Sequence, residues 1–272
     1  MAFNGTCGIW RREAIDDAGG WQGDTLSEDL DLSIRAQLAG WKGCYVGTVA
    51  VPGELPQTAR AWRTQQSRWT KGYAQCTVKL LPRVWRCDWP IWHRLAVTMQ
   101  LSQSLFFPLG LLCLLLSLPL IAANAHFHPA LVAIGLSTTG LGVAGTLSFL
   151  ATGQRVTAGR RLAHSLPHIL VAMVLTSGLL LSNTRSVLEG LAGRRSEFVR
   201  TPKSRALSTA PGGHRWHGLA EVGAGLALLA FLVLNHAWTG ALMLFVIGGL
   251  LSIGLMQLTD ASRAIGEARL PQ

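Results

Sequence analysis

Three carboxylates lie within four residues in the segment Ser27-Glu28-Asp29-Leu30-Asp31. A carboxylate within hydrogen-bond reach of a hydroxyl can act as a general base in group transfer. The same side chains also suit the first turn of a helix, where the helix dipole favours negative charge. For this segment alone the structural interpretation is favoured, so a catalytic one needs further signals.

Two other groups could carry chemistry. Gln65, Arg68 and Trp69 have the spacing i, i+3, i+4, which places them on one face of a predicted helix. An arginine stem and a tryptophan that cover a membrane-proximal helix would give the same pattern. The second group lies in the basic segment 198–203, and the ordinary explanation for its charge is a cytoplasmic loop.

The elements that must position these residues are predicted to form a mixed α/β region. Helices are expected from Arg11 to Ala18, before Gly19-Gly20, and from an N-cap at Ser27 to Gly40. A third helix is expected from about Thr58 to Leu81, with Pro82 ending it. A short strand is expected at Cys7–Trp10, and a second is expected from Cys44–Val46 together with Val49–Val51, closed by Pro52-Gly53.

The rest of the chain is typical of a membrane protein. Hydrophobic residues make up 49% and charged residues 14% of the sequence, against about 25% charged in soluble domains. No Asp, Glu, Lys or Arg occurs between Leu95 and Gln154. Segments long enough to span a bilayer are Leu95–Ala123, Ala130–Ala151, Trp216–Asn235 and Ala237–Leu258. This composition excludes disordered, collagen-like and disulfide-rich secreted proteins.

A fifth apolar segment, Leu162–Thr184, is predicted to be interfacial or re-entrant. A full crossing would put the basic residues that follow it on the outer side, against the positive-inside rule. Its uninterrupted apolar part, Ile169–Leu181, is also short for a span. Without that crossing, every basic loop is cytoplasmic. Trp and Arg side chains between residues 83 and 94 further predict a helix at the headgroup level.

The net charge of +10 does not indicate nucleic-acid binding, because most basic residues beyond residue 94 lie between apolar runs. Residues 1–94 are nearly balanced in charge. The five cysteines include no Cys-x-x-Cys, which argues against a disulfide framework or a zinc site.

In order and context, these segments resemble the processive family 2 glycosyltransferases of membranes, the group of cellulose, hyaluronan and mannan synthases. Phe3-Asn4-Gly5-Thr6-Cys7-Gly8 is similar to the family's segment at the acceptor end. Ser27-Glu28-Asp29 is similar to its Thr-Glu-Asp motif. Gln65, Arg68 and Trp69 match Gln-x-x-Arg-Trp in full. Phe198, Thr201 and Lys203 resemble its Phe-x-Val-Thr-x-Lys gating loop, with Arg200 where Val is usual.

The resemblance implies a role for each matched residue. Asp29 would be the base that deprotonates the acceptor hydroxyl, with Glu28 shaping its surroundings. Trp69 would face a sugar ring, Arg68 would hold the diphosphate or the acceptor, and Gln65 would hydrogen-bond nearby. Thr201 and Lys203 would close over the nucleotide, beside Phe198, and Cys7 would lie near the acceptor sugar.

The implied function is inverting transfer from a nucleotide-sugar donor to a growing β-linked polysaccharide, which the protein extrudes. The implied fold is a mainly α membrane protein. Its partial α/β (GT-A-like) cytoplasmic portion, residues 1–94, precedes about four transmembrane helices and one interfacial or re-entrant helix in residues 95–258. Residues 95–258 also include a gating-type loop at 194–205, and residues 259–272 form a cytoplasmic tail. The expected location is the inner (plasma) membrane, with residues 1–94 cytoplasmic.

The family holds its donor and a Mg or Mn ion with aspartates upstream of the Phe-Asn-Gly-Thr segment, and only Met1 and Ala2 precede that segment here. Asp29-x-Asp31 has similar spacing but belongs to the base motif, so no metal ligand is predicted in this chain. The expectation is therefore a C-terminal portion, inactive alone, whose donor-binding half or partner subunit is missing. The alternative is an inactive membrane fragment or accessory subunit of such a synthase.

Overall fold

The computed structural model describes residues 3, 5, 7–49, 51, 53, 55–56, 58–126, 128–159, 162–194, 196, 215–236 and 241–268. By contacts, the chain divides into two compact units. The first comprises Met1–Leu111, Leu180–Gly213 and Asp260–Gln272. The second comprises Leu112–Leu179 and His214–Thr259.

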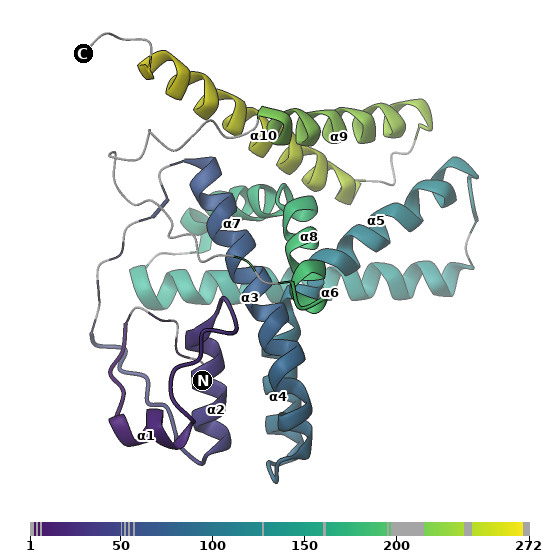
Figure 1. Cartoon of the computed structure of the whole chain (residues 1–272). Helices are drawn as coiled ribbons and strands as arrows, with labels where there is room; N and C mark the ends of the chain where they lie inside the picture. The colour runs from purple at the N-terminus through teal and green to yellow at the C-terminus, as the bar shows by residue number, and fades with distance from the viewer. Residues whose placement is uncertain are drawn as a thin grey trace. The chain divides into compact units, whose positions relative to one another are not determined.

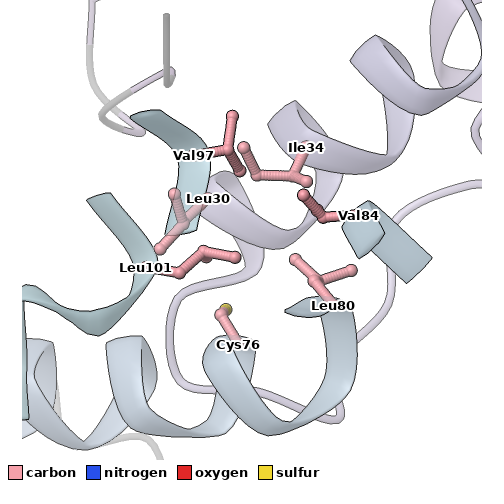
Figure 2. Close-up of a cluster of buried hydrophobic side chains, with 7 residues drawn as sticks. All are labelled: Leu30, Ile34, Cys76, Leu80, Val84, Val97 and Leu101. Atoms are coloured by element: carbon pink, nitrogen blue, oxygen red, sulfur yellow. The ribbon is translucent and has the colours of Figure 1, made fainter. Parts of the chain in front are cut away.

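Helix α3 (Ala59–Arg86) organises the first unit and packs against α2 (Glu28–Leu38), α4 (Ile91–Ser102) and α8 (Leu180–Leu191) (Figure 1). A short helix, α1 (Arg12–Asp17), contacts α2, and a 3-10 turn, η1 (Gln103–Leu105), follows α4. Figure 2 shows the apolar cluster that joins α2, α3 and α4. It consists of Leu30, Ile34, Cys76, Leu80, Val84, Val97 and Leu101.

The predicted end of the third helix at Pro82 is wrong, because α3 continues to Arg86. A proline inside a helix removes one backbone hydrogen bond. Here Leu80 and Val84, on either side of Pro82, are fully buried in the apolar cluster. Burial of two such side chains is worth about 3–6 kcal/mol, which offsets the loss at the proline.

The predicted strands do not form in the described part of the chain. Cys7–Trp10 and Cys44–Val46 are irregular loops, and Val49–Val51 lies partly outside the described residues. A strand needs a neighbour to pair its backbone groups, and neither loop has one among the described residues. The structure is mainly α as predicted, but the α/β (GT-A-like) portion is not confirmed.

The second unit contains the end of α5 (Phe106–Ala122), α6 (Pro129–Ala158), α7 (Leu162–Ser177), α9 (Arg215–Leu234) and most of α10 (Ala241–Ala268). Leu232, Met243 and Ile247 form its apolar cluster. Backbones approach closely where α10 passes α7, since a Cβ on Gly249 would meet the carbonyl oxygen of Val174. Between α9 and α10, Gln257 Nε2 donates to Glu221 Oε2 at 2.7 Å.

Four helical segments are long and apolar enough to cross a membrane: Ile91–Ala122, Pro129–Val156, Trp216–Leu234 and Met243–Asp260. They overlap the four predicted spans. Helices α7 and α8 are separated by a sharp bend and form either one broken span or a re-entrant pair. The re-entrant assignment of Leu162–Thr184 therefore stays a prediction.

Candidate active site

The first turn of α2 separates its acids into two environments. Asp31 is fully buried, and its Oδ2 accepts hydrogen bonds from Arg35 Nε at 2.8 Å and Nη2 at 2.6 Å. Its Oδ1 lies 2.9 Å from Lys79 Nζ. Arg35 also donates to the carbonyl oxygens of Ala18 and Gly20. Both oxygens of Asp31 have a cationic partner, so this carboxylate joins α2 to α3 through Lys79, while Arg35 joins α2 to the residues that follow α1.

Asp29 is only half-buried, and its two oxygens differ. Oδ1 accepts the backbone N–H of Leu30 at 2.8 Å. Oδ2 lies against Gly5, where a Cβ would be 2.7 Å away. The backbone N–H of Phe3 donates to Ser33 Oγ, one turn further along α2, at 3.0 Å. Phe3 and Gly5 of the predicted acceptor-end segment thus lie against the face of α2 that carries Asp29.

Gly5 has a backbone angle φ of +82°, a conformation that favours glycine. Together with its close approach to Asp29, this explains why a glycine occupies the position. Any side chain there would press on the carboxylate.

Helix α3 carries the second motif toward the same end of α2. Gln65 and Arg68 are half-buried, and Trp69 is 46% exposed. One turn later, a Cβ on Gly72 would lie 2.8 Å from the backbone nitrogen of Ser27. Gln75 Oε1 accepts the N–H of Leu26 at 2.9 Å. The helix that bears Arg68 and Trp69 is therefore fixed to the residues that begin α2.

Tyr73 is a candidate site residue that the sequence analysis missed. Burial raises the pKa of its hydroxyl, the negative charge of Asp29 adds to that rise, and a hydrogen bond with Gln103 opposes it. A raised pKa keeps this hydroxyl protonated at neutral pH, as a neutral donor in the field of Asp29. The sequence signal that could have identified Tyr73 is its position four residues after Trp69, which places both side chains on one face of the helix.

Cys76 has a different environment, one turn further on. Its thiol donates to the carbonyl oxygen of Ser27 at 3.6 Å, and burial raises its pKa to about 12. A thiol that stays protonated is a poor nucleophile. Cys76 therefore belongs to the packing of α3 on α2.

The remaining predicted site residues are placed as follows. Glu28 is half-buried beside Asp29, and Cys7 is exposed between Gly5 and Gly8. Phe198, Thr201 and Lys203 lie outside the described residues.

The described residues do not fit the divalent cation that the resemblance implies. A metal site needs free carboxylate oxygens, and both oxygens of Asp31 are held by Arg35 and Lys79. No cluster of three or more His, Cys, Asp or Glu side chains with metal-binding geometry occurs in the described part of the chain. Asp29-x-Asp31 is therefore not a metal motif here.

Comparison with known proteins identifies the class. Residues 1–188 match the family Glycosyl transferase family group 2. The chain belongs to this family of glycosyltransferases.

Curated relatives add detail. The chain is 54% identical over 84 residues to "Probable glucomannan 4-beta-mannosyltransferase 11" of Oryza sativa subsp. japonica. The aligned residues make up 31% of this chain and 15% of the relative. It is 50% identical over 86 residues to glucomannan 4-beta-mannosyltransferase 2 of Arabidopsis thaliana. That alignment covers 32% of this chain and 16% of the relative. The chain thus spans less than a fifth of these relatives. No solved structure matches.

Proposed function

We propose that this chain provides the acceptor side of an inverting membrane glycosyltransferase. The enzyme would transfer a sugar from a nucleotide-sugar donor to a growing β-linked polysaccharide and extrude the product through its membrane helices. The names of the relatives favour a 4-β-linked mannosyl transfer, so nucleotide-activated mannose is the first donor to test.

The observation that supports this proposal is the contrast between Asp29 and Asp31. Asp31 is neutralised by two cations in the interior, whereas Asp29 presents Oδ2 to the Gly5 segment. A general base must lie within hydrogen-bond reach of the acceptor hydroxyl. Asp29 is half-buried whereas Asp31 is fully buried, which supports Asp29 as that base. In the proposed step, Asp29 accepts the proton of the acceptor hydroxyl, and the oxygen of that hydroxyl bonds to the anomeric carbon of the donor sugar. The bond from that carbon to the diphosphate breaks, and the diphosphate leaves.

The residues of α3 would bind around this reaction. Trp69 is exposed enough to stack on an acceptor sugar, and the guanidinium of Arg68 suits a diphosphate or a sugar hydroxyl. Gln65 would hydrogen-bond to the acceptor. Tyr73 would act as a neutral donor next to Asp29. By resemblance, Phe198, Thr201 and Lys203 would close over the donor. A divalent metal, if used, would be held by residues other than those described here.

The proposed arrangement in the membrane follows the charge pattern. Residues 1–94 and 259–272 would face the cytoplasm, with the membrane region at 95–258 and a cytoplasmic loop at 194–205. The inner (plasma) membrane is the proposed location. The candidate spans and the basic loops between them support this topology.

Asp29→Asn tests the proposal. The substitution keeps the shape and removes the base, so sugar incorporation by membranes that hold the full-length protein should fall by about 100-fold or more. The matched control is Asp16→Asn, which alters an exposed carboxylate paired with Arg12 on α1 and should retain wild-type turnover. Wild-type turnover in Asp29→Asn would reject Asp29 as the base. No incorporation by the wild-type protein with any nucleotide sugar would favour an inactive accessory subunit.

A further inference from the structure

A cavity of about 500 Å³ lies along α8, within the first unit. Binding sites for small ligands usually measure about 300–1,000 Å³. Leu181, Arg185 and Leu188 line the cavity and recur every three or four residues, so they form one stripe along the helix. The cavity is not part of the candidate active site, because neither Asp29 nor Trp69 is among its described lining residues.

The two ends of the cavity differ in polarity. Leu111 lines it near the start of α8, where a Cβ on the neighbouring Gly110 would lie 3.6 Å from Leu180 Cδ1. Leu111 also belongs to the candidate span Ile91–Ala122, so this end adjoins a segment that can cross a membrane. Arg194 lines the cavity just past the end of α8, so the other end is cationic. An amphiphilic ligand would match this gradient.

The charges around the cavity favour an anion. Glu189 is the one carboxylate among the described lining residues, and two cations already bond to it. Arg185 Nε donates to its Oε1 at 2.9 Å, and Lys71 Nζ lies 3.0 Å from its Oε2. Arg194 adds a further positive charge. The cationic end therefore keeps an excess of positive charge that an anionic group can neutralise.

Thr184 gives an independent indication of a ligand. It lines the cavity and is 5% exposed, and its hydroxyl has no hydrogen-bond partner among the described residues. A buried hydroxyl without a partner destabilises a fold, so such groups usually bond to water or to a bound molecule. A polar group of a ligand in the cavity would supply the missing partner.

We propose that this cavity binds an anionic phospholipid. The phosphate would lie between Arg185 and Arg194, and a glycerol or ester oxygen would bond to the hydroxyl of Thr184. An acyl chain would lie against Leu111 and Leu181. The inference is independent of the sugar transfer in the proposed function, because no residue of the candidate active site takes part in it.

The apolar wall favours a lipid over other anions. Inorganic phosphate could pair with the arginines, but it would leave Leu181 and Leu188 uncovered, and these are 36% and 54% exposed. A phospholipid covers the leucines and neutralises the arginines together. The predicted topology also puts the end of α8 on the cytoplasmic side, where the membrane surface is anionic.

The experiment titrates phosphatidylglycerol into the full-length protein in a zwitterionic detergent and follows the thermal midpoint. A ligand that binds the folded state raises the midpoint, so the concentration at half of the maximal rise reports the affinity. Phosphatidylcholine and glycerol 3-phosphate, which is a headgroup without chains, are the comparison ligands. We expect only phosphatidylglycerol to raise the midpoint. An equal rise with phosphatidylcholine would show a nonspecific lipid effect, and one with glycerol 3-phosphate would show a phosphate site; either would overturn the proposal.

Charge-removing variants test the cationic end. Arg185→Gln combined with Arg194→Gln should weaken phosphatidylglycerol binding about 30-fold. The matched control combines Arg83→Gln with Arg86→Gln, which removes the same charge from exposed positions near the end of α3. An equal loss in the control would reduce the effect to general attraction and overturn the site. If the test pair lowers the lipid-free midpoint, Arg194→Gln alone decides, with an expected loss of about fivefold.

Two further variants test the other walls. Leu181→Ser should weaken binding about tenfold, whereas Leu191→Ser should not, since Leu191 is 37% exposed on the same helix but is not a lining residue. Thr184→Val should weaken binding about fivefold without lowering the lipid-free midpoint. Equal binding by the two serine variants would overturn the acyl-chain contact. Unchanged binding by Thr184→Val would overturn the role of the hydroxyl.

Discussion

The two halves of α3 are built for different tasks. From Trp62 to Trp69 its side chains are half-buried or exposed, and they include Gln65 and Arg68. From Thr70 to Val84 the helix is anchored by fully buried side chains on successive turns, such as Leu80. Sites placed on a rigid element are more exact than sites on loops. The contrast teaches that packing of the second half, Thr70 to Val84, fixes the helix, so that the first half can hold Gln65 and Arg68 at fixed positions.

The largest expected effect comes from breaking the packed half. Leu80→Ala removes a fully buried side chain from the cluster of α2, α3 and α4. The free energy of unfolding should fall by about 2–5 kcal/mol, measured by thermal unfolding of the detergent-solubilised protein. Val78→Ala, on the exposed side of the same helix, should change it by less than about 0.5 kcal/mol. Equal effects would show that the two faces of α3 are not packed differently.

The next effect falls at the junction between the halves. In Gly72→Ala the new Cβ would meet Ser27 at its backbone nitrogen and its side chain, so α2 and α3 must move apart. We expect the free energy of unfolding to fall by about 1–3 kcal/mol. Turnover should also fall, because Asp29 lies in the first turn of α2, the helix that is displaced. The control is Gly140→Ala on α6, where nothing lies within 4 Å of the added Cβ. Wild-type stability and turnover in Gly72→Ala would contradict the close approach.

The smallest effect on stability is expected in the site half. Trp69→Ala should lower turnover about tenfold, as expected for loss of one aromatic contact to a sugar, while the thermal midpoint stays unchanged. Trp85→Ala is the matched control, since Trp85 lies on the same helix and is 42% exposed against 46% for Trp69. A drop in thermal midpoint for Trp69→Ala, without a specific loss of turnover, would assign Trp69 to packing.

The sequence predicted the candidate membrane spans better than it predicted the limits of the elements in residues 1–94. Spans follow from long apolar runs alone. The end of α3 depended on the burial of Val84 in the cluster shared with α2 and α4, whose residues are distant in sequence, and this packing overrides the local effect of Pro82. The predicted strands failed for the same kind of reason, since pairing depends on a neighbour and not on local composition.

The acids of α2 show a similar limit. The sequence identified Glu28, Asp29 and Asp31 together but could not assign Asp31 to the interior. The available signal was Arg35, four residues after Asp31 and therefore one turn away. The role of Lys79 could not be read locally, because it approaches Asp31 from a different helix.

The hydrogen bond between Glu221 and Gln257 has a consequence for how the protein enters its membrane. Glu221 is 2% exposed and lies within the candidate span Trp216–Leu234, and Gln257 lies within Met243–Asp260. Isolated acidic side chains in lipid cost about 2.5–3.5 kcal/mol on insertion scales. Neither helix completes this polar contact until the other is beside it. The Glu221–Gln257 hydrogen bond therefore forms only when α9 and α10 insert together as a hairpin, and neither helix inserted alone can form it.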